Sequence, residues 1–168
     1  MKNINKGLLI IGAGGHGKVV KEVAEAVGYD KIAFLDDNSE EAVGKIADSK
    51  QFVQEYQAAF GGIGNNKFRN ELLQRLEQEG YEIPVLLHPT AYISKTAVIG
   101  KGTVVEPKAI VNANSKVGSG CIISVGAIVD HDVVLEDCVH VNAGAICKAG
   151  SFVAKETKLE AGQVVKGY

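Results

Sequence analysis

AIVDHD-VVLEDC-VHVNAG, residues 127–144, is a run of three hexads that share one pattern. Each hexad begins with Ala or Val, carries an aliphatic residue at its third position, and continues into polar or small residues. The pattern repeats without insertion in thirteen hexads over residues 91–168, where Cys147 is the one third-position residue that is not aliphatic. An ordinary sheet would need turn residues and chain reversals that interrupt so strict a period. The period therefore predicts a parallel β-helix, in which each hexad is a short strand plus a corner and stacked coils bury the third-position side chains.

The chain before about residue 88 follows a different pattern. Short β-branched runs alternate with helix-like stretches, which indicates βαβ units and a parallel sheet. Asn65-Asn66 and Gly80 mark the start and the end of the second helix. The predicted architecture is therefore a Rossmann-like α/β domain over residues 1–88 and an all-β domain over residues 89–168. The expected strands cover residues 8–12, 31–35, 58–63 and 83–87, and the expected helices cover about 15–27 and 66–79.

Composition and charge exclude several classes of partner. The net charge is −2 and no cluster of Lys and Arg is present, so we expect no nucleic-acid binding. The apolar run at residues 7–12 is far too short to span a bilayer and leads into glycines rather than a cleavage site, so we expect neither membrane insertion nor export. The three cysteines fit no disulfide framework and no metal-binding CxxC pattern, which indicates a cytoplasmic protein without a metal.

The motif GAGGHG at residues 12–17 follows a predicted strand and opens a predicted helix. In that context glycines allow the backbone to approach a phosphate, and the helix N-terminus supplies free N–H groups. Asp36-Asp37 ends the second strand, where an acidic residue contacts a ribose in nucleotide-binding sheets. The motif alone leaves three interpretations open, which are a tight βα turn, an NAD site and a sugar-nucleotide site.

Three polar residues, Asp130-His131-Asp132, follow an inward-facing pair, Ala127 and Val129, in their hexad. They should therefore form a corner that faces out of the β-helix. A corner of this kind is either solvated surface or a site, and the residues by themselves permit both.

The hexad series together with the glycine-rich turn resembles the left-handed β-helix of hexapeptide-repeat acyltransferases. It is most similar to the sialic acid O-acetyltransferase family, particularly to bacterial members that N-acetylate UDP-4-amino sugars. The resemblance implies a left-handed coil, a homotrimer of parallel prisms, and acetyl-CoA bound in the groove between neighbouring subunits.

The resemblance also implies roles for individual residues. His131 would be the general base and Asp132 the acid that supports it, with Asp130 as the alternative partner. Imidazole titrates near working pH, and a carboxylate on its other nitrogen fixes the tautomer. Gly144 and Gly150 should offer backbone N–H groups, one of which would stabilise the oxyanion. The UDP-sugar would contact Gly14, Gly15, His16, Asp36, Asp37 and Gly64, and acetyl-CoA would contact His140, Gly144, Gly150 and Gly162.

The expected function is an acetyl-CoA-dependent N-acetyltransferase that acetylates the 4-amino group of a UDP-4-amino-4,6-dideoxy sugar by direct attack. O-acetylation of sialic acid or another sugar is the nearest alternative, because the pattern does not separate amine from hydroxyl acceptors. A non-catalytic sugar-nucleotide-binding scaffold is an alternative of another class. Family members usually continue for further coils and a proline-containing tail that helps hold the coenzyme, whereas this sequence has thirteen hexads.

Overall fold

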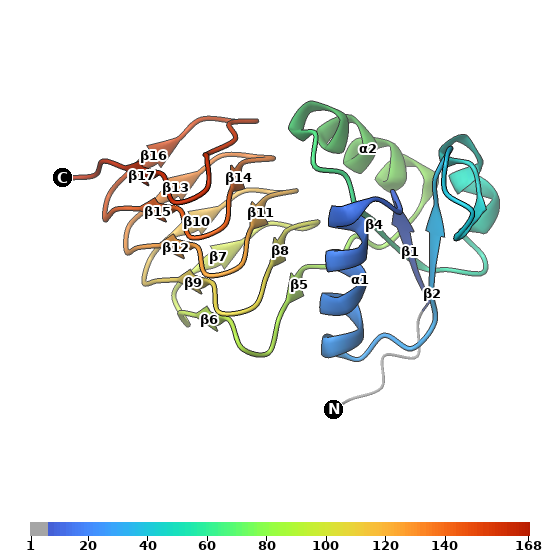
Figure 1. The fold of residues 1–168 in the computed structure, drawn as a ribbon, viewed down its shortest axis with the longest axis horizontal. Coiled ribbons are helices and arrows are strands. Elements are labelled where there is room, and N and C mark those ends of the chain that lie inside the picture. The colour runs from blue at the N-terminus through green and yellow to red at the C-terminus, as the bar shows by residue number, and fades with distance from the viewer. Residues whose placement is uncertain (1–6) are drawn as a thin grey trace. The chain divides into compact units, whose positions relative to one another are not determined.

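The computed structural model describes residues 7–168, and the chain divides into two compact units, Met1–Pro84 and Val85–Tyr168 (Figure 1). Each unit has its own hydrophobic core. The predicted fold class, an α/β parallel sheet followed by a left-handed parallel β-helix, is confirmed.

The first unit is a four-stranded parallel sheet with the strand order β3-β2-β1-β4. Its strands are β1 (Leu8–Ile11), β2 (Ile32–Leu35), β3 (Ala42–Gly44) and β4 (Ala58–Gly61). Its helices are α1 (Gly15–Val27), the 3₁₀ helix η1 (Ile46–Phe52) and α2 (Asn66–Glu79). Both predicted helices are present, whereas β3 and η1 lie in a stretch for which the sequence predicted no element.

Helix α2 begins and ends where its sequence signals predicted. The Asn65 side chain accepts a hydrogen bond from Phe68 N at 2.9 Å, which caps the start of α2. Gly80 ends α2 with φ +98°, a left-handed conformation that glycine adopts at little cost. Leu72 and Leu76 are buried in the core beside the strands. The apolar face of α2 therefore packs the helix on the sheet.

The prediction that residues 83–87 form a strand of this sheet is wrong. A single bridge joins Glu82 to Ala58, and β5 (Leu86–Leu87) pairs instead with β8 (Val104–Val105) in the second unit. Pro84 lies between the two and has no N–H to donate to a ladder. The chain therefore leaves the first sheet before β5.

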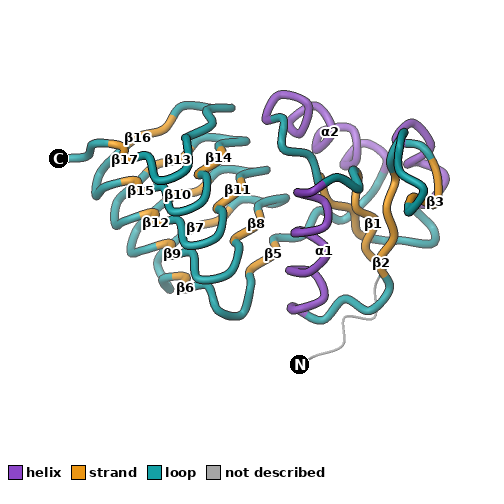
Figure 2. Tube along the Cα trace, viewed as in Figure 1, coloured by secondary structure: helices purple, strands orange, loops and turns teal. Residues whose placement is uncertain are grey.

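The second unit consists of two-residue strands that pair in parallel with the strands eighteen residues before and after them. They form three sheets, β7-β10-β13-β16, β5-β8-β11-β14 and β6-β9-β12-β15-β17. Figure 2 shows these short strands separated by corners in every coil. The strands after β5 are β6 (Tyr92–Ile93), β7 (Val98–Ile99), β8 (Val104–Val105), β9 (Ile110–Val111), β10 (Lys116–Val117), β11 (Ile122–Ile123), β12 (Ile128–Val129), β13 (Val134–Leu135), β14 (His140–Val141), β15 (Ile146–Cys147), β16 (Phe152–Val153) and β17 (Val164–Val165).

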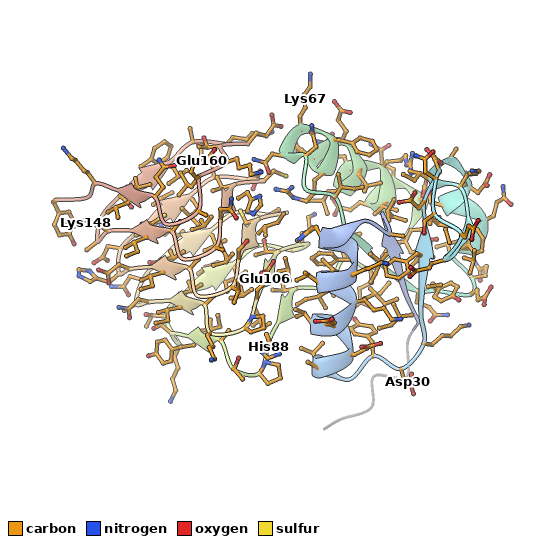
Figure 3. The ribbon with its side chains drawn as sticks, in the orientation of Figure 1. Asp30, Lys67, His88, Glu106, Lys148 and Glu160 are labelled. Atoms are coloured by element: carbon orange, nitrogen blue, oxygen red, sulfur yellow. The ribbon has the colours of Figure 1, made fainter. Side chains whose placement is uncertain are left out.

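The interior of the β-helix holds the first and third residues of the hexads. Ala127, Val129 and Leu135 are at most 1% exposed, whereas charged side chains such as Lys148 and Glu160 lie at the surface (Figure 3). Identical inward positions in successive coils stack on one another, so the core is continuous along the helix.

Candidate functional site

The corner between β12 and β13 brings His131 and Asp132 into direct contact. Nδ1 of His131 lies 2.8 Å from Oδ2 of Asp132, and the side chains are 45% and 46% exposed. An ionised carboxylate only accepts hydrogen bonds, so Nδ1 carries the proton and Nε2 is the basic nitrogen. This hydrogen bond raises the pKa of His131 above its ordinary value and lowers the pKa of Asp132. The pair has the chemistry of a general base with a supporting acid.

Asp132 owes its orientation to the corner. Its backbone is left-handed, with φ +58°, a conformation that Asp tolerates better than most residues. Its N–H donates to Ala113 O in the preceding coil at 2.9 Å. Its carboxylate also accepts from Asn114 Nδ2 at 3.2 Å and from the Tyr168 hydroxyl at 3.5 Å.

Asp130 makes different contacts. Its Oδ1 accepts from the backbone N–H of His131 at 2.8 Å and from Asn112 Nδ2 at 3.1 Å, and these bonds lower its pKa. The carboxylate that hydrogen-bonds the imidazole of His131 is therefore that of Asp132, and Asp130 shapes the backbone of the corner.

His140 begins β14, so it lies on a different sheet from β12 and β13. Its Nε2 is 3.1 Å from Ser124 Oγ, and its side chain is half-buried. Gly144 and Gly162 occupy stacked corners with open space where a side chain would begin. At Gly150, by contrast, an added Cβ would lie 2.0 Å from the ring of Tyr168.

The expected oxyanion donors are not available in this structure. The N–H of Gly144 donates to Val125 O at 3.1 Å, and the N–H of Gly150 donates to His131 O at 3.0 Å. Both groups belong to the hydrogen bonds that join successive coils at the corners. The prediction that one of them is accessible is therefore wrong, because the ladder between coils uses these N–H groups.

The six residues expected to contact a sugar nucleotide all lie at the carboxyl edge of the first sheet. Gly14, Gly15 and His16 follow β1, Asp36-Asp37 follow β2, and Gly64 follows β4. Strands β2 and β4 both pair with β1, so the three loops are neighbours at the edge where open α/β sheets bind ligands.

The glycine-rich turn brings backbone close to backbone on one side and leaves the other side open. An added Cβ at Gly17 would lie 1.9 Å from Gly12 O, so α1 packs directly on the end of β1. At Gly14 and Gly15 no atom lies within 4 Å of an added Cβ. Gly14 is the N-cap of α1 and supplies no side chain to it, so the first-turn N–H groups are suited to an anion.

The two aspartates after β2 differ in their contacts. Asp36 accepts from Ala13 N and from Asn38 N, each at 2.8 Å, which lowers its pKa and joins the loops after β1 and β2. Asp37 is exposed and accepts from Ile46 N at 3.1 Å. The role of Asp36 in shaping the turn was not foreseen from the sequence.

Arg69 supports the loop that carries Gly64. For Asn65, Asn66 and Arg69 the sequence left two roles open, a contact with the sugar nucleotide or capping and decoration of the helix. Arg69 is only 2% exposed and donates to Ile63 O at 2.9 Å, to Gly64 O at 3.4 Å and to Asn66 Oδ1 at 2.7 Å. The i, i+3 spacing of Asn66 and Arg69 was the available signal for this contact.

Within residues 7–168, no group of three or more His, Cys, Asp or Glu side chains is arranged to hold a metal ion. In the same described part of the chain, no helix has the length and hydropathy needed to cross a membrane.

Comparison with known proteins relates both units to sugar acetyltransferases. Residues 7–76 match the PglD N-terminal domain family. A UDP-N-acetylbacillosamine N-acetyltransferase of Bacillus subtilis (strain 168) is 32% identical over 111 residues, which cover 60% of this chain and 51% of that protein. The match thus spans about half the length of this curated relative.

Several solved structures are similar over almost the whole chain. The acetyltransferase domain of PglB from Neisseria gonorrhoeae FA1090, in complex with acetyl coenzyme A, is 36% identical with a TM-score of 0.91, and the match covers 97% of this chain and 83% of that one. A variant of perosamine N-acetyltransferase from Caulobacter crescentus, in which asparagine replaces a histidine, was solved in complex with CoA and GDP-perosamine. It is 27% identical with a TM-score of 0.88, and the match covers 96% of this chain and 89% of that one.

Proposed function

The chain belongs to the family of sugar N-acetyltransferases that join a PglD N-terminal domain to a hexapeptide β-helix, and we propose that it transfers an acetyl group from acetyl-CoA to the amino group of a nucleotide-linked amino sugar. The single observation that carries this proposal is the hydrogen bond of 2.8 Å between His131 Nδ1 and Asp132. It leaves Nε2 of an exposed imidazole free to accept a proton. The expected acceptor is the 4-amino group of a UDP-4-amino-4,6-dideoxy sugar.

In the proposed reaction the sugar amine attacks the thioester carbonyl carbon of acetyl-CoA directly. His131 Nε2 takes the proton that the nitrogen loses as the new C–N bond forms. The imidazolium is stabilised by the ionised Asp132, and its proton is then available to the departing thiolate of CoA. The amide and free CoA are the products.

The cysteines favour direct transfer over an acyl-enzyme. Cys121 and Cys147 are fully buried in the β-helix core, and burial raises the pKa of Cys147 to about 11. Cys138 is also fully buried. Since the thiolate is the nucleophilic form, these thiols are poorly suited to attack a thioester. Buried thiols of this kind also fit the reducing cytoplasm that the sequence predicted.

We propose that the sugar nucleotide lies at the carboxyl edge of the first sheet. The open positions at Gly14, Gly15 and Gly64 allow close approach of a diphosphate, with His16 and Asp37 beside them. Asp36 would act by shaping the turn. For acetyl-CoA, the expected contacts are His140 with Gly144, Gly150 and Gly162, of which Gly144 and Gly162 have open space.

The outward face of the β-helix supports a homotrimer. The second hexad positions of two sheets are mostly apolar, and several of these side chains are 53–62% exposed, namely Tyr92, Val98, Phe152 and Val164. A large exposed apolar surface is typical of an interface. The corner that carries His131 joins these two sheets, which fits an active site shared between subunits.

Release of CoA, measured with several acceptors, tests the function. We expect turnover with UDP-4-amino-4,6-dideoxy sugars, with the GDP-linked amino sugar as a comparison for the nucleotide. Activity with sialic acid and none with either amino-sugar nucleotide would show that the reaction is O-acetylation rather than N-acetylation. Calorimetry that showed sugar-nucleotide binding without acetyl-CoA binding would instead favour the scaffold.

A further inference from the structure

Two hexads one coil apart have closely related sequences. AIVNAN, residues 109–114, and AIVDHD, residues 127–132, begin with the same three residues and differ in the last three. Strands β9 and β12 pair in register, so the two corners stack. Each asparagine of the first corner consequently meets the aspartate eighteen residues later, Asn112 with Asp130 at 3.1 Å and Asn114 with Asp132 at 3.2 Å.

We propose that Asn114 is a positioning residue for acetyl transfer, which holds the carboxylate of Asp132 in the orientation that engages His131. The inference rests on the proposed function, because it concerns the base of that reaction. Asn114 Nδ2 donates to Oδ1 of Asp132, while Oδ2 lies 2.8 Å from Nδ1 of His131. With one partner on each oxygen, rotation of the carboxylate would break at least one hydrogen bond.

Asp132 needs such support because its surroundings do not supply it. Its side chain is 46% exposed, so packing does not restrict its rotamer. Its third partner, the Tyr168 hydroxyl, is at 3.5 Å, the outer limit of a hydrogen bond. Asn114 is therefore the closest side-chain partner of Asp132 apart from His131.

Asn114 is itself held in place. Its backbone is left-handed, with φ +59°, and its N–H donates to Thr96 Oγ1 at 2.9 Å in the coil before. The carboxylate of Asp132 can only accept, so the amide nitrogen of Asn114 must face it. The contact is thus determined by the stacked corners and by the chemistry of the two groups.

Asn112 has a different effect, although it also contacts the aspartate eighteen residues later in the chain. The oxygen that it contacts on Asp130 also accepts the backbone N–H of His131. The Asn112–Asp130 pair therefore supports the backbone of the corner, whereas the Asn114–Asp132 pair supports the imidazole. The second pair should have the larger effect on the basicity of His131, because the hydrogen bond from Asp132 raises the pKa of His131 more than the charge of Asp130 does.

Asn114→Gly is the decisive variant, because glycine keeps the left-handed backbone and removes the amide. Glu156→Gly is its matched control, since Glu156 has φ +60° at a different corner. We expect Asn114→Gly to lower kcat roughly 10-fold, within the range for a misplaced catalytic group, and to leave both KM values within about 2-fold. The acidic limb of kcat/KM should move to lower pH, because His131 loses support. Glu156→Gly should show neither change.

A double-mutant cycle with Asp132→Ala tests whether Asn114 acts through Asp132. In the Asp132→Ala background, Asn114→Gly should lower kcat no further. An equal loss in both backgrounds, or an unchanged kcat and pH profile in the single variant, would overturn the proposal. If Asn114→Gly does not fold, Asn114→Asp replaces the donor by an acceptor at a position that tolerates Asp. Wild-type kcat in that variant would likewise overturn it.

An NMR titration separates this proposal from the proposed function. Four histidines are present, and the His131 signal is assigned from its absence in His131→Ala. Asn114→Gly should lower the pKa of His131 relative to the wild type, whether or not any acceptor is acetylated. An unchanged pKa would overturn the positioning role, whereas a wild-type protein without turnover would overturn only the function.

Discussion

His131 and Asp132 are each about half exposed, so the hydrogen bond between them contributes little to folding stability. Its consequence is chemical, because the acid fixes the tautomer of the imidazole and supports its protonated form. Substitutions of these two residues should therefore change the rate of the reaction and leave the fold intact.

We expect His131→Ala to remain folded and to lose roughly 100- to 10,000-fold in kcat, the range for removal of a general base. The affinity for both substrates should stay close to that of the wild type, because in the proposed reaction the imidazole acts on the transferred proton. Steady-state kinetics and thermal denaturation of the two proteins give the comparison. A variant that kept most of its kcat would show that the corner is only a solvated surface feature.

Asp132→Asn should shift the pH profile. Asp132 is the main cause of the raised pKa of His131, so its loss lowers that pKa. The base must be unprotonated to act, and activity falls as pH drops through its pKa. The acidic limb of kcat/KM should consequently move to lower pH, while kcat falls less than in His131→Ala because imidazole remains. A limb that moved to higher pH would contradict the assigned partner.

The turn between β1 and α1 shows how one element places another. Gly12, with φ +103°, follows β1, and Gly17 lets α1 approach Gly12 O more closely than any side chain would allow. The helix axis is therefore set by a backbone contact, and the open side of the turn, at Gly14 and Gly15, remains accessible.

Two glycine substitutions should separate these roles. Gly17→Ala places a Cβ 1.9 Å from Gly12 O and should destabilise the protein by about 1–3 kcal/mol, as overpacking does. Gly15→Ala meets no atom within 4 Å and should leave the stability almost unchanged, while it raises KM for the sugar nucleotide. Urea denaturation and kinetics check the pair. Equal destabilisation by both would show that the turn is closed on both sides.

At the scale of the molecule, the apolar outer face of the β-helix determines the expected assembly. The second hexad positions of the sheet β6-β9-β12-β15-β17 are all apolar, namely Tyr92, Ile110, Ile128, Ile146 and Val164. These side chains point away from the core, so an isolated β-helix leaves them partly or largely exposed to solvent. A closed trimer would cover this row in every subunit.

Ile128→Glu should therefore dissociate the proposed trimer, since it places a charge in the middle of this row. Sedimentation equilibrium should give a monomer for the variant and a trimer for the wild type. Lys158→Glu is the control, because Lys158 is exposed and its backbone pairs with that of His140, which lies on a different sheet. The trimer of this variant should persist. A monomeric wild type at micromolar concentration would contradict the assembly and the shared active site.

The sequence by itself determined the elements of this protein whose cause is local or periodic. The period of six predicted the β-helix because each coil must bury the same hexad positions as the coil before it. Asn65 and Gly80 predicted the ends of α2, because capping depends on residues within one helical turn. The pairing of His131 with Asp132 was predicted from the family resemblance. Adjacency in the chain left both Asp130 and Asp132 as possible partners.

Only the tertiary structure decided which polar groups meet across the fold. Asp36 binds Ala13 N because β1 and β2 pair in one register, and Asn114 reaches Asp132 because two corners stack. The N–H groups of Gly144 and Gly150 are used by neighbouring coils, and β5 joins β8 rather than the first sheet. Contacts of this kind join residues that are about twenty positions apart. They depend on how strands and coils are stacked in space, which no local pattern specifies.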